Sequence, residues 1–208
     1  MAYRLGVDVG GTFTDLLLVH EKSGKTWSAK VPSTPADQSI GVVNGMMRVC
    51  EHAGIDPATI VHVMHGTTVA TNTVLTGTGA KCGLVTTKGY RQVLQIARSF
   101  VPGGLGGWVF YIKSLPLAPL SCTIAADARV RAKGEIVHAL DEGQLRSSLR
   151  ELKSKDIEAL TVSLINSFAN DTHEKRIRDI AAEELPGIPV SLSSEVVPEM
   201  QEYERTVT

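Results

Sequence analysis

The stretch that decides the fold runs from Leu5 to His20 and reads LGVDVGGTFTDLLLVH. Leu5 to Val9 is a short apolar run that ends in two glycines, and Thr14 to His20 is a second apolar run. Both runs have the length and the branched side chains of β-strands, with a Gly-Gly turn between them. Strands joined by so short a turn are antiparallel neighbours, so the chain is predicted to open as a hairpin.

The chain continues with one more strand and a long helix. Thr26 to Val31 predicts a third strand, which completes an antiparallel meander. Apolar residues then recur at helical spacing from Ile40 to Ala53, with Thr34 as the candidate N-cap and Gly54 at the end. Two strand–helix pairs follow, at residues 60–64 and 69–75 and at residues 81–86 and 90–96. The predicted order of elements is therefore β-β-β-α-β-α-β-α.

The remainder of the chain differs in character. Residues 99–123 are rich in glycine and proline, and we expect a long irregular loop there, which is either functional or a plain surface excursion. Residues 124–208 again alternate strand and helix patterns. We therefore divide the single region 1–208 into a core over 1–98, this loop, and a second α/β portion over 124–208.

Composition limits the classes of protein to consider. The chain has 208 residues, 43% of them hydrophobic and 21% charged, with a net charge of -1, which is ordinary for a globular protein. The chain has no excess of basic residues, so its charge gives no indication of a nucleic-acid partner. Apolar runs such as Leu16–Val19 are too short to span a membrane, and the start does not read as a signal peptide, so we expect a cytoplasmic protein. The three cysteines form no C-x-x-C pair, which argues against a zinc cluster.

The first candidate site is Asp8-Val9-Gly10-Gly11-Thr12-Phe13-Thr14-Asp15. Glycines let the backbone approach a ligand closely, and successive N–H groups in a turn form a concave anion site. Thr12 and Thr14 add hydroxyl donors, and Asp8 at a strand end is suited to hold Mg²⁺ through water. The alternative is a plain hairpin with Gly-Gly in its turn. The motif is neither a Walker loop nor a Rossmann fingerprint, because no Gly-Lys-Ser/Thr follows and G-x-G-x-x-G is absent.

The second candidate site is His65-Gly66-Thr67-Thr68-Val69-Ala70-Thr71-Asn72. It follows a predicted strand and opens a predicted helix, which is where α/β proteins commonly bind ligands and where free helix N–H groups favour an anion. His65 is suited to relay a proton or to hydrogen-bond a carbonyl near neutral pH. The alternative is structural: Thr67 and Thr68 cap the helix, and His65 is hydrogen-bonded within the fold.

These motifs carry a resemblance to known proteins. The first motif and the order of elements resemble the first phosphate loop and the ribonuclease-H-like domain of the actin, sugar-kinase and heat-shock-chaperone ATPase superfamily. The two motifs together are similar to the two signatures of the hydantoinase A/5-oxoprolinase family's N-terminal region. The resemblance covers essentially the whole chain, with further matching stretches at Gly83 to Arg91, at Ser167-Phe168 with His173-Glu174, and from Ser194-Glu195 through Glu202-Tyr203-Glu204-Arg205.

The resemblance implies an α/β fold, with a ribonuclease-H-like core on the nucleotide side over 1–98 and further α/β elements after it. It implies an enzyme that uses ATP and Mg²⁺ to open a cyclic amide such as a hydantoin or 5-oxoproline, through a phosphorylated intermediate. The implied catalytic residues are Asp8 and His65, with Asp8 also holding Mg²⁺ through water. The implied cofactor-binding residues are Gly10, Gly11, Thr12, Thr14, Asp15, Gly66, Thr67, Thr68 and Asn72.

Partners and alternatives follow from the same resemblance. The implied partners are a small cyclic amide or ketone, a second subunit or C-terminal domain, and further copies in a homo-oligomer, with no nucleic acid and no membrane. Family members are much longer, so we expect the chain to be the N-terminal part of a longer enzyme and to be inactive alone. A subunit of an acetone- or acetophenone-type carboxylase stays open as an alternative. A nucleotide-binding regulatory or scaffold module without catalysis is the alternative from another class.

Overall fold

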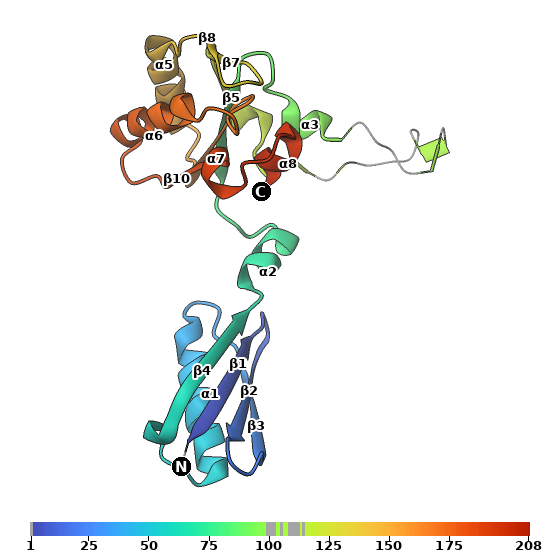
Figure 1. Ribbon diagram of the computed structural model, residues 1–208, viewed down its shortest axis with the longest axis vertical. Helices are drawn as coiled ribbons and strands as arrows, with labels where there is room; N and C mark the ends of the chain where they lie inside the picture. Colours follow the sequence, from blue (N-terminus) through green and yellow to red (C-terminus); the bar gives the residue numbers. More distant parts are fainter. Residues whose placement is uncertain (1, 99–102, 105, 108–112, 114) are drawn as a thin grey trace. The chain divides into compact units, whose positions relative to one another are not determined.

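The structure is a computed structural model that describes residues 2–98, 103–104, 106–107, 113 and 115–208. It divides into two compact units, Met1–Gly79 and Ala80–Thr208, each described below by itself (Figure 1). Both units combine helices with a sheet, which confirms the predicted α/β class. No helix among the described residues is long and apolar enough to cross a membrane. Much of the loop expected over 99–123 falls outside the described residues.

The first unit is built on a four-stranded sheet with the order β3-β2-β1-β4. β1 (Tyr3–Val9) and β2 (Phe13–His20) form the predicted antiparallel hairpin, and β3 (Thr26–Pro32) pairs antiparallel to β2. β4 (Ile60–Thr67) runs parallel to β1 at the other edge. The carboxyl ends of β1 and β4 therefore meet at one end of the sheet.

The helix α1 (Gln38–Ala53) crosses from β3 to β4 and packs on one face of this sheet (Figure 1). Alternation along β1 and β2 buries Leu5, Val7 and Leu16 against it. The N-cap is Asp37, whose carboxylate accepts from the N–H of Ser39. The expected N-cap at Thr34 was wrong by position, although the Thr34 hydroxyl still serves this end of the helix: it donates to the Asp37 carbonyl and accepts from the N–H of Gly41 at 3.0 Å.

The end of the first unit departs from the predicted order. β4 extends to Thr67, so His65 and Gly66 lie within the strand, and the helix α2 (Val69–Thr76) follows it. β5 (Cys82–Thr87) belongs to the other unit, where it pairs with β6 and β9. The elements expected in one core over 1–98 are thus shared between two sheets. A local strand pattern does not specify the strand's partner, which depends on contacts far along the chain.

The second unit holds a parallel sheet with the order β10-β9-β5-β6. Leucine, isoleucine and valine side chains fill the space between the sheet and its helices α5 and α6. A short hairpin, β7 with β8, lies beside the sheet. The bounds of the remaining elements are η1 Pro57–Thr59, α3 Val93–Ile96, η2 Leu120–Cys122, β6 Thr123–Ala126, β7 Arg129–Val130, β8 Ile136–His138, α5 Glu142–Lys153, β9 Ala159–Ser163, α6 Thr172–Glu184, β10 Val190–Leu192, α7 Ser193–Val196 and α8 Glu202–Val207.

The core of the second unit also contains a buried polar network. The Glu174 carboxylate, which is fully buried, accepts from the N–H groups of Leu164 and Ser194 and from the hydroxyl of Ser193 at 2.7 Å. The Arg205 guanidinium donates to the same Ser193 oxygen at 3.1 Å and to the Leu164 carbonyl at 2.7 Å. Ser193 therefore links a buried anion to a buried cation, and the two charges hold both sides of Leu164.

Candidate functional site

The first unit brings the two sequence motifs together at the carboxyl ends of β1 and β4. The Val9 carbonyl accepts from the Thr67 hydroxyl at 3.3 Å and from the Thr68 N–H at 3.3 Å. These bonds place the start of α2 beside the Gly10-Gly11-Thr12 loop. The two motifs, which the resemblance assigns to one nucleotide site, therefore lie next to each other within this unit.

Gly11 lies directly against α2. A Cβ added to Gly11 would be 3.1 Å from Nδ2 of Asn72, which is tighter than ordinary contact. Asn72 is itself held by a bond from Nδ2 to the Thr68 hydroxyl at 3.2 Å. A Cβ at Gly10 would lie 3.0 Å from the Phe13 carbonyl. Neither glycine has a positive φ, so both are required for space and not for a left-handed backbone.

The loop presents free donors to solvent. Gly11 and Thr12 are exposed, and their N–H groups make no hydrogen bond to any described residue. Thr14 behaves differently, because it is fully buried and its hydroxyl contacts the Ser33 hydroxyl at 3.0 Å. We expected Thr14 among the ligand-binding residues, but strand alternation turns its side chain inward, beneath the loop.

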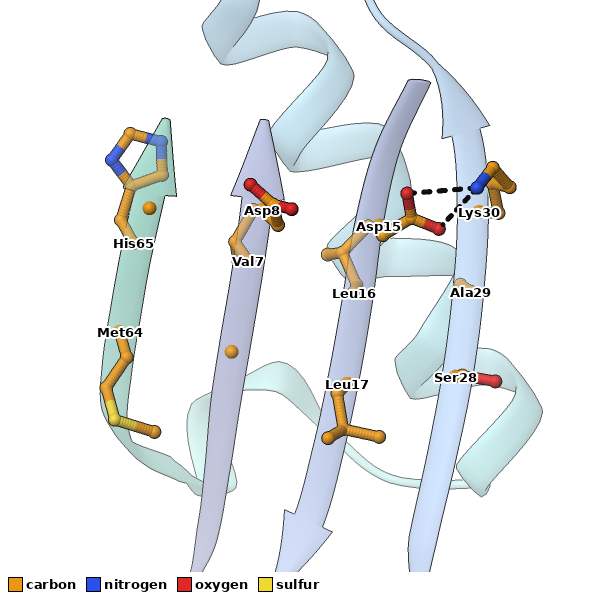
Figure 2. A pocket seen from close by; sticks show the side chains of 12 residues that line it. Val7, Asp8, Asp15, Leu16, Leu17, Ser28, Ala29, Lys30, Met64 and His65 are labelled. Atoms are coloured by element: carbon orange, nitrogen blue, oxygen red, sulfur yellow. Dashed lines mark hydrogen bonds and ion pairs between the residues drawn. The ribbon is translucent and has the colours of Figure 1, made fainter. Parts of the chain in front are cut away.

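A polar row crosses the face of the sheet opposite α1 (Figure 2). Its members are directly paired across the strands: Gly66 with Asp8, Asp8 with Asp15, and Asp15 with Lys30. The Lys30 ammonium lies 2.9 Å and 3.0 Å from the two Asp15 oxygens. Asp15 is thus neutralised by a cation, whereas the exposed Asp8 carboxylate makes no ion pair with a described residue.

The row borders a shallow hollow of about 640 Å³. Its floor includes Gly6, which lacks a side chain, between the exposed apolar residues Leu17 and Met64. Gly66, which is paired with Asp8, places no side chain beside the Asp8 carboxylate on this face. An apolar floor beside a charged row suits a small molecule that is part apolar and part polar.

His65 does not share this face with Asp8. It pairs with Val7, whose side chain is buried against α1, and neighbouring residues on a strand point to opposite faces. Its ring lies at the edge of the sheet, on β4 (Figure 2). The side chains of Asp8 and His65 therefore lie on opposite faces of the sheet, near the same end of it.

The donor set at Asp8 is compatible with Mg²⁺ but not with a closed protein cage. Among the described residues, no group of three or more His, Cys, Asp or Glu side chains is arranged to hold a metal ion. Mg²⁺ commonly uses one or two carboxylates and completes its shell with water and phosphate oxygens. One free carboxylate beside an exposed loop of N–H donors fits that pattern.

Sequence reasoning missed two residues of this site, Lys30 and Ser33. Lys30 completes the polar row, and Ser33 contacts the phosphate-loop candidate from the end of β3. Strand alternation alone places Lys30 on the same face as Ser28, but its partner follows only from the register of β2 with β3. No local pattern marks Ser33.

Comparison with known proteins places the chain in a family. Residues 4–185 match the hydantoinase/oxoprolinase N-terminal region. The chain is 35% identical to the acetophenone carboxylase gamma subunit of Aromatoleum aromaticum, over 98% of this chain and 30% of that protein. It is 32% identical to the caprolactamase subunit alpha of Pseudomonas jessenii, over 99% of this chain and 30% of that protein.

Solved structures agree with these relatives. The nucleotide-free structure of acetone carboxylase superposes with a TM-score of 0.89 at 28% identity, over 98% of this chain and 30% of that one. The ATP-dependent caprolactamase of Pseudomonas jessenii superposes with a TM-score of 0.84 at 31% identity, with the same coverage. The chain thus spans about 30% of the length of these relatives. The chain belongs to the hydantoinase/oxoprolinase family and corresponds to its N-terminal region.

Proposed function

We propose that the Gly10-Gly11-Thr12 loop binds the phosphate groups of ATP. The exposed N–H groups of Gly11 and Thr12, which have no partner among the described residues, are the observation that carries this proposal. Backbone donors of this kind form a concave site for an anion, and the start of α2 adds a favourable dipole. Gly66, Thr67, Thr68 and Asn72 border the same end of the sheet and complete the proposed binding site.

Asp8 is proposed to hold Mg²⁺ through water beside these phosphates, with Asp15 kept in place by Lys30. The ion would neutralise charge that phosphoryl transfer spreads over oxygen atoms. His65, on the edge strand β4, is proposed to contact the substrate. For the fold, we propose that this unit is a ribonuclease-H-like nucleotide domain. The strand order β3-β2-β1-β4, with α1 between β3 and β4 in the chain, supports this.

The reaction proposed for the whole protein is ATP-dependent opening of a cyclic amide. An amide oxygen is a poor leaving group, and its phosphorylation makes it a good one. The names of two relatives, caprolactamase and 5-oxoprolinase, support this substrate class. Because several relatives are named as subunits, we also propose that the protein works with a second kind of subunit.

A carboxylase subunit is the second candidate. The relative named as a subunit of acetophenone carboxylase is 35% identical, and the acetone carboxylase structure has a TM-score of 0.89. The two candidates differ in their products. Incubation of the whole protein with ATP, labelled bicarbonate and a ketone would fix label into the ketone in one case, and incubation with ATP and a lactam would release an amino acid in the other.

Calorimetric titration of the whole protein with Mg-ATP and Mg-ADP tests the nucleotide site. Asp8→Ala and Gly11→Val are expected to abolish saturable binding, while Asp179→Ala, an exposed aspartate of α6, serves as the matched control. Loss of binding in the control as well would reject the assignment of the site. No binding by a folded parent protein would favour the scaffold alternative, and binding without turnover in the whole protein would favour a regulatory module.

A further inference from the structure

The residue that follows β3, Ser33, bonds to both sides of the phosphate-loop candidate. Its hydroxyl donates to the Gly10 carbonyl at 2.7 Å, and its N–H donates to the Thr12 carbonyl at 2.9 Å. Ser33 is half-buried and lies 23 residues from Gly10 in sequence. Two of the loop's carbonyl groups are therefore held by one residue from another strand end.

These bonds determine where the loop's N–H groups point. A peptide unit is planar and trans, so the carbonyl of one residue and the N–H of the next point in opposite directions. The Gly10 carbonyl is directed at Ser33, so the Gly11 N–H is directed away from it. The Thr12 carbonyl is likewise directed at Ser33, which turns the Phe13 N–H outward from Ser33. Two of the loop's peptide units, Gly10–Gly11 and Thr12–Phe13, thus have their carbonyl on the Ser33 side and their N–H on the other side, where donors would meet an anion.

The buried side chain of Thr14 contacts Ser33 on the inner side of the loop. A hydroxyl carries a single proton, and Ser33 gives its proton to the Gly10 carbonyl. The contact between the Thr14 and Ser33 hydroxyls at 3.0 Å must therefore use the Thr14 proton. Thr14 is fully buried and Ser33 is half-buried, so the bond is partly shielded from water. The chain of bonds runs from Thr14 through Ser33 to Gly10.

We propose that Ser33, supported by Thr14, is a positioning residue that sets the Gly10-Gly11-Thr12 loop in its anion-binding form. The role rests on the proposed function, because it concerns the same loop. Ser33 contacts only the carbonyl side, so it is not itself a ligand of the phosphate. Without it, the Gly10 peptide is free to rotate and to turn its carbonyl toward the anion.

The test compares Ser33→Ala with Ser33→Thr, which keeps the hydroxyl. The probes are Mg-ADP and inorganic phosphate, titrated into ¹⁵N-labelled chain, with the Gly11 and Thr12 amide signals as the readout. Ser33→Ala is expected to weaken Mg-ADP binding by about five- to tenfold, the usual effect of losing one hydrogen bond, and Ser33→Thr by less than about twofold. The free Ser33→Ala chain should also show altered Gly11 and Thr12 amide signals.

Ser23→Ala is the matched control, since Ser23 lies at the opposite end of β2 and bonds His20. It is expected to leave both readouts unchanged. Ser33→Cys, a weak donor of similar size, replaces Ser33→Ala if that variant does not fold. Normal binding and unchanged amide signals in Ser33→Ala would overturn the positioning role of Ser33 but would leave the proposed nucleotide site in place. A folded parent chain that binds neither probe would overturn the proposed function and this role together.

Discussion

Gly11 of the first motif and Asn72 of the second are packed against each other, with only 3.1 Å between a Cβ at Gly11 and Nδ2 of Asn72. The two motifs are separated in sequence by β3 and α1, and the absence of a side chain at Gly11 allows them to approach this closely. Asn72 cannot move away freely, because its side chain is bonded to Thr68. A change at Gly11 is therefore expected to displace the second motif as well as the first.

Replacement of Gly11 should therefore affect folding and binding through the same contact. Gly11→Ala is expected to lower the free energy of unfolding by about 1 kcal/mol and Gly11→Val by about 1–3 kcal/mol, as overpacking does. Urea denaturation measures both. The double variant Gly11→Ala with Asn72→Ala should regain most of the lost stability but not nucleotide binding. If the second substitution restores no stability, the contact is not the cause, and Gly143→Ala in α5 provides the control for an unhindered glycine.

Asp8 and Asp15 are expected to differ in effect although both carry a carboxylate on the same face. Asp8→Asn should weaken Mg-ADP binding by about 10- to 100-fold, the range for a hydrogen bond to a charged group, and should remove the difference between titrations in Mg²⁺ and in EDTA. Asp15→Asn should have a much smaller effect, because Lys30 already occupies that carboxylate. Equal losses in the two variants would argue that the metal is bound between them.

Lys30 is expected to stabilise the row by neutralising Asp15, which lies directly opposite the like charge of Asp8. Lys30→Met leaves Asp15 unpaired directly opposite Asp8, which should lower the free energy of unfolding by about 0.2–1 kcal/mol. The loss should disappear at 1 M salt, where the Debye length is about 3 Å. Urea denaturation at low and high salt measures this, with Lys30→Arg as the control. A loss that persists at high salt would point to the contact of the Lys30 ammonium with the Phe13 ring.

Much of this site could be predicted from sequence because it rests on short-range patterns. The hairpin from Leu5 to His20 and the helix up to Ala53 follow from hydrophobic period and turn residues. The parallel pairing of β4 with β1, which brings the two motifs to one end of the sheet, does not follow from a local pattern. The contacts of Lys30 and Ser33 could not be predicted, because they depend on the register between strands. The same reason explains β5, whose sequence predicts a strand but not the sheet that it joins.

A buried histidine should make the second unit sensitive to mild acid. Burial lowers the pKa of His173, and its Nδ1 atom has no hydrogen-bond partner among the described residues. The unfolded chain then binds a proton more readily than the folded one, so stability is full above the ordinary pKa of about 6.5 and falls as the pH drops toward the folded pKa. Thermal unfolding between pH 7.5 and 5 should show a falling midpoint that is shallower in His173→Gln. Parallel curves for the two proteins would assign the acid sensitivity to other groups.

The Glu174–Ser193–Arg205 network should be the most costly place to mutate in the second unit. Arg205→Met leaves the fully buried Glu174 carboxylate without its cation and is expected to lower the free energy of unfolding by about 3–5 kcal/mol. Ser193→Ala should cost less, about 1–3 kcal/mol, because it removes the bridge but keeps both charges. Urea denaturation followed by circular dichroism measures these losses. The double variant Glu174→Gln with Arg205→Met should be more stable than the sum of its single variants predicts, since no unpaired charge remains. Strict additivity would show that the two groups act separately, and that Ser193 does not couple them.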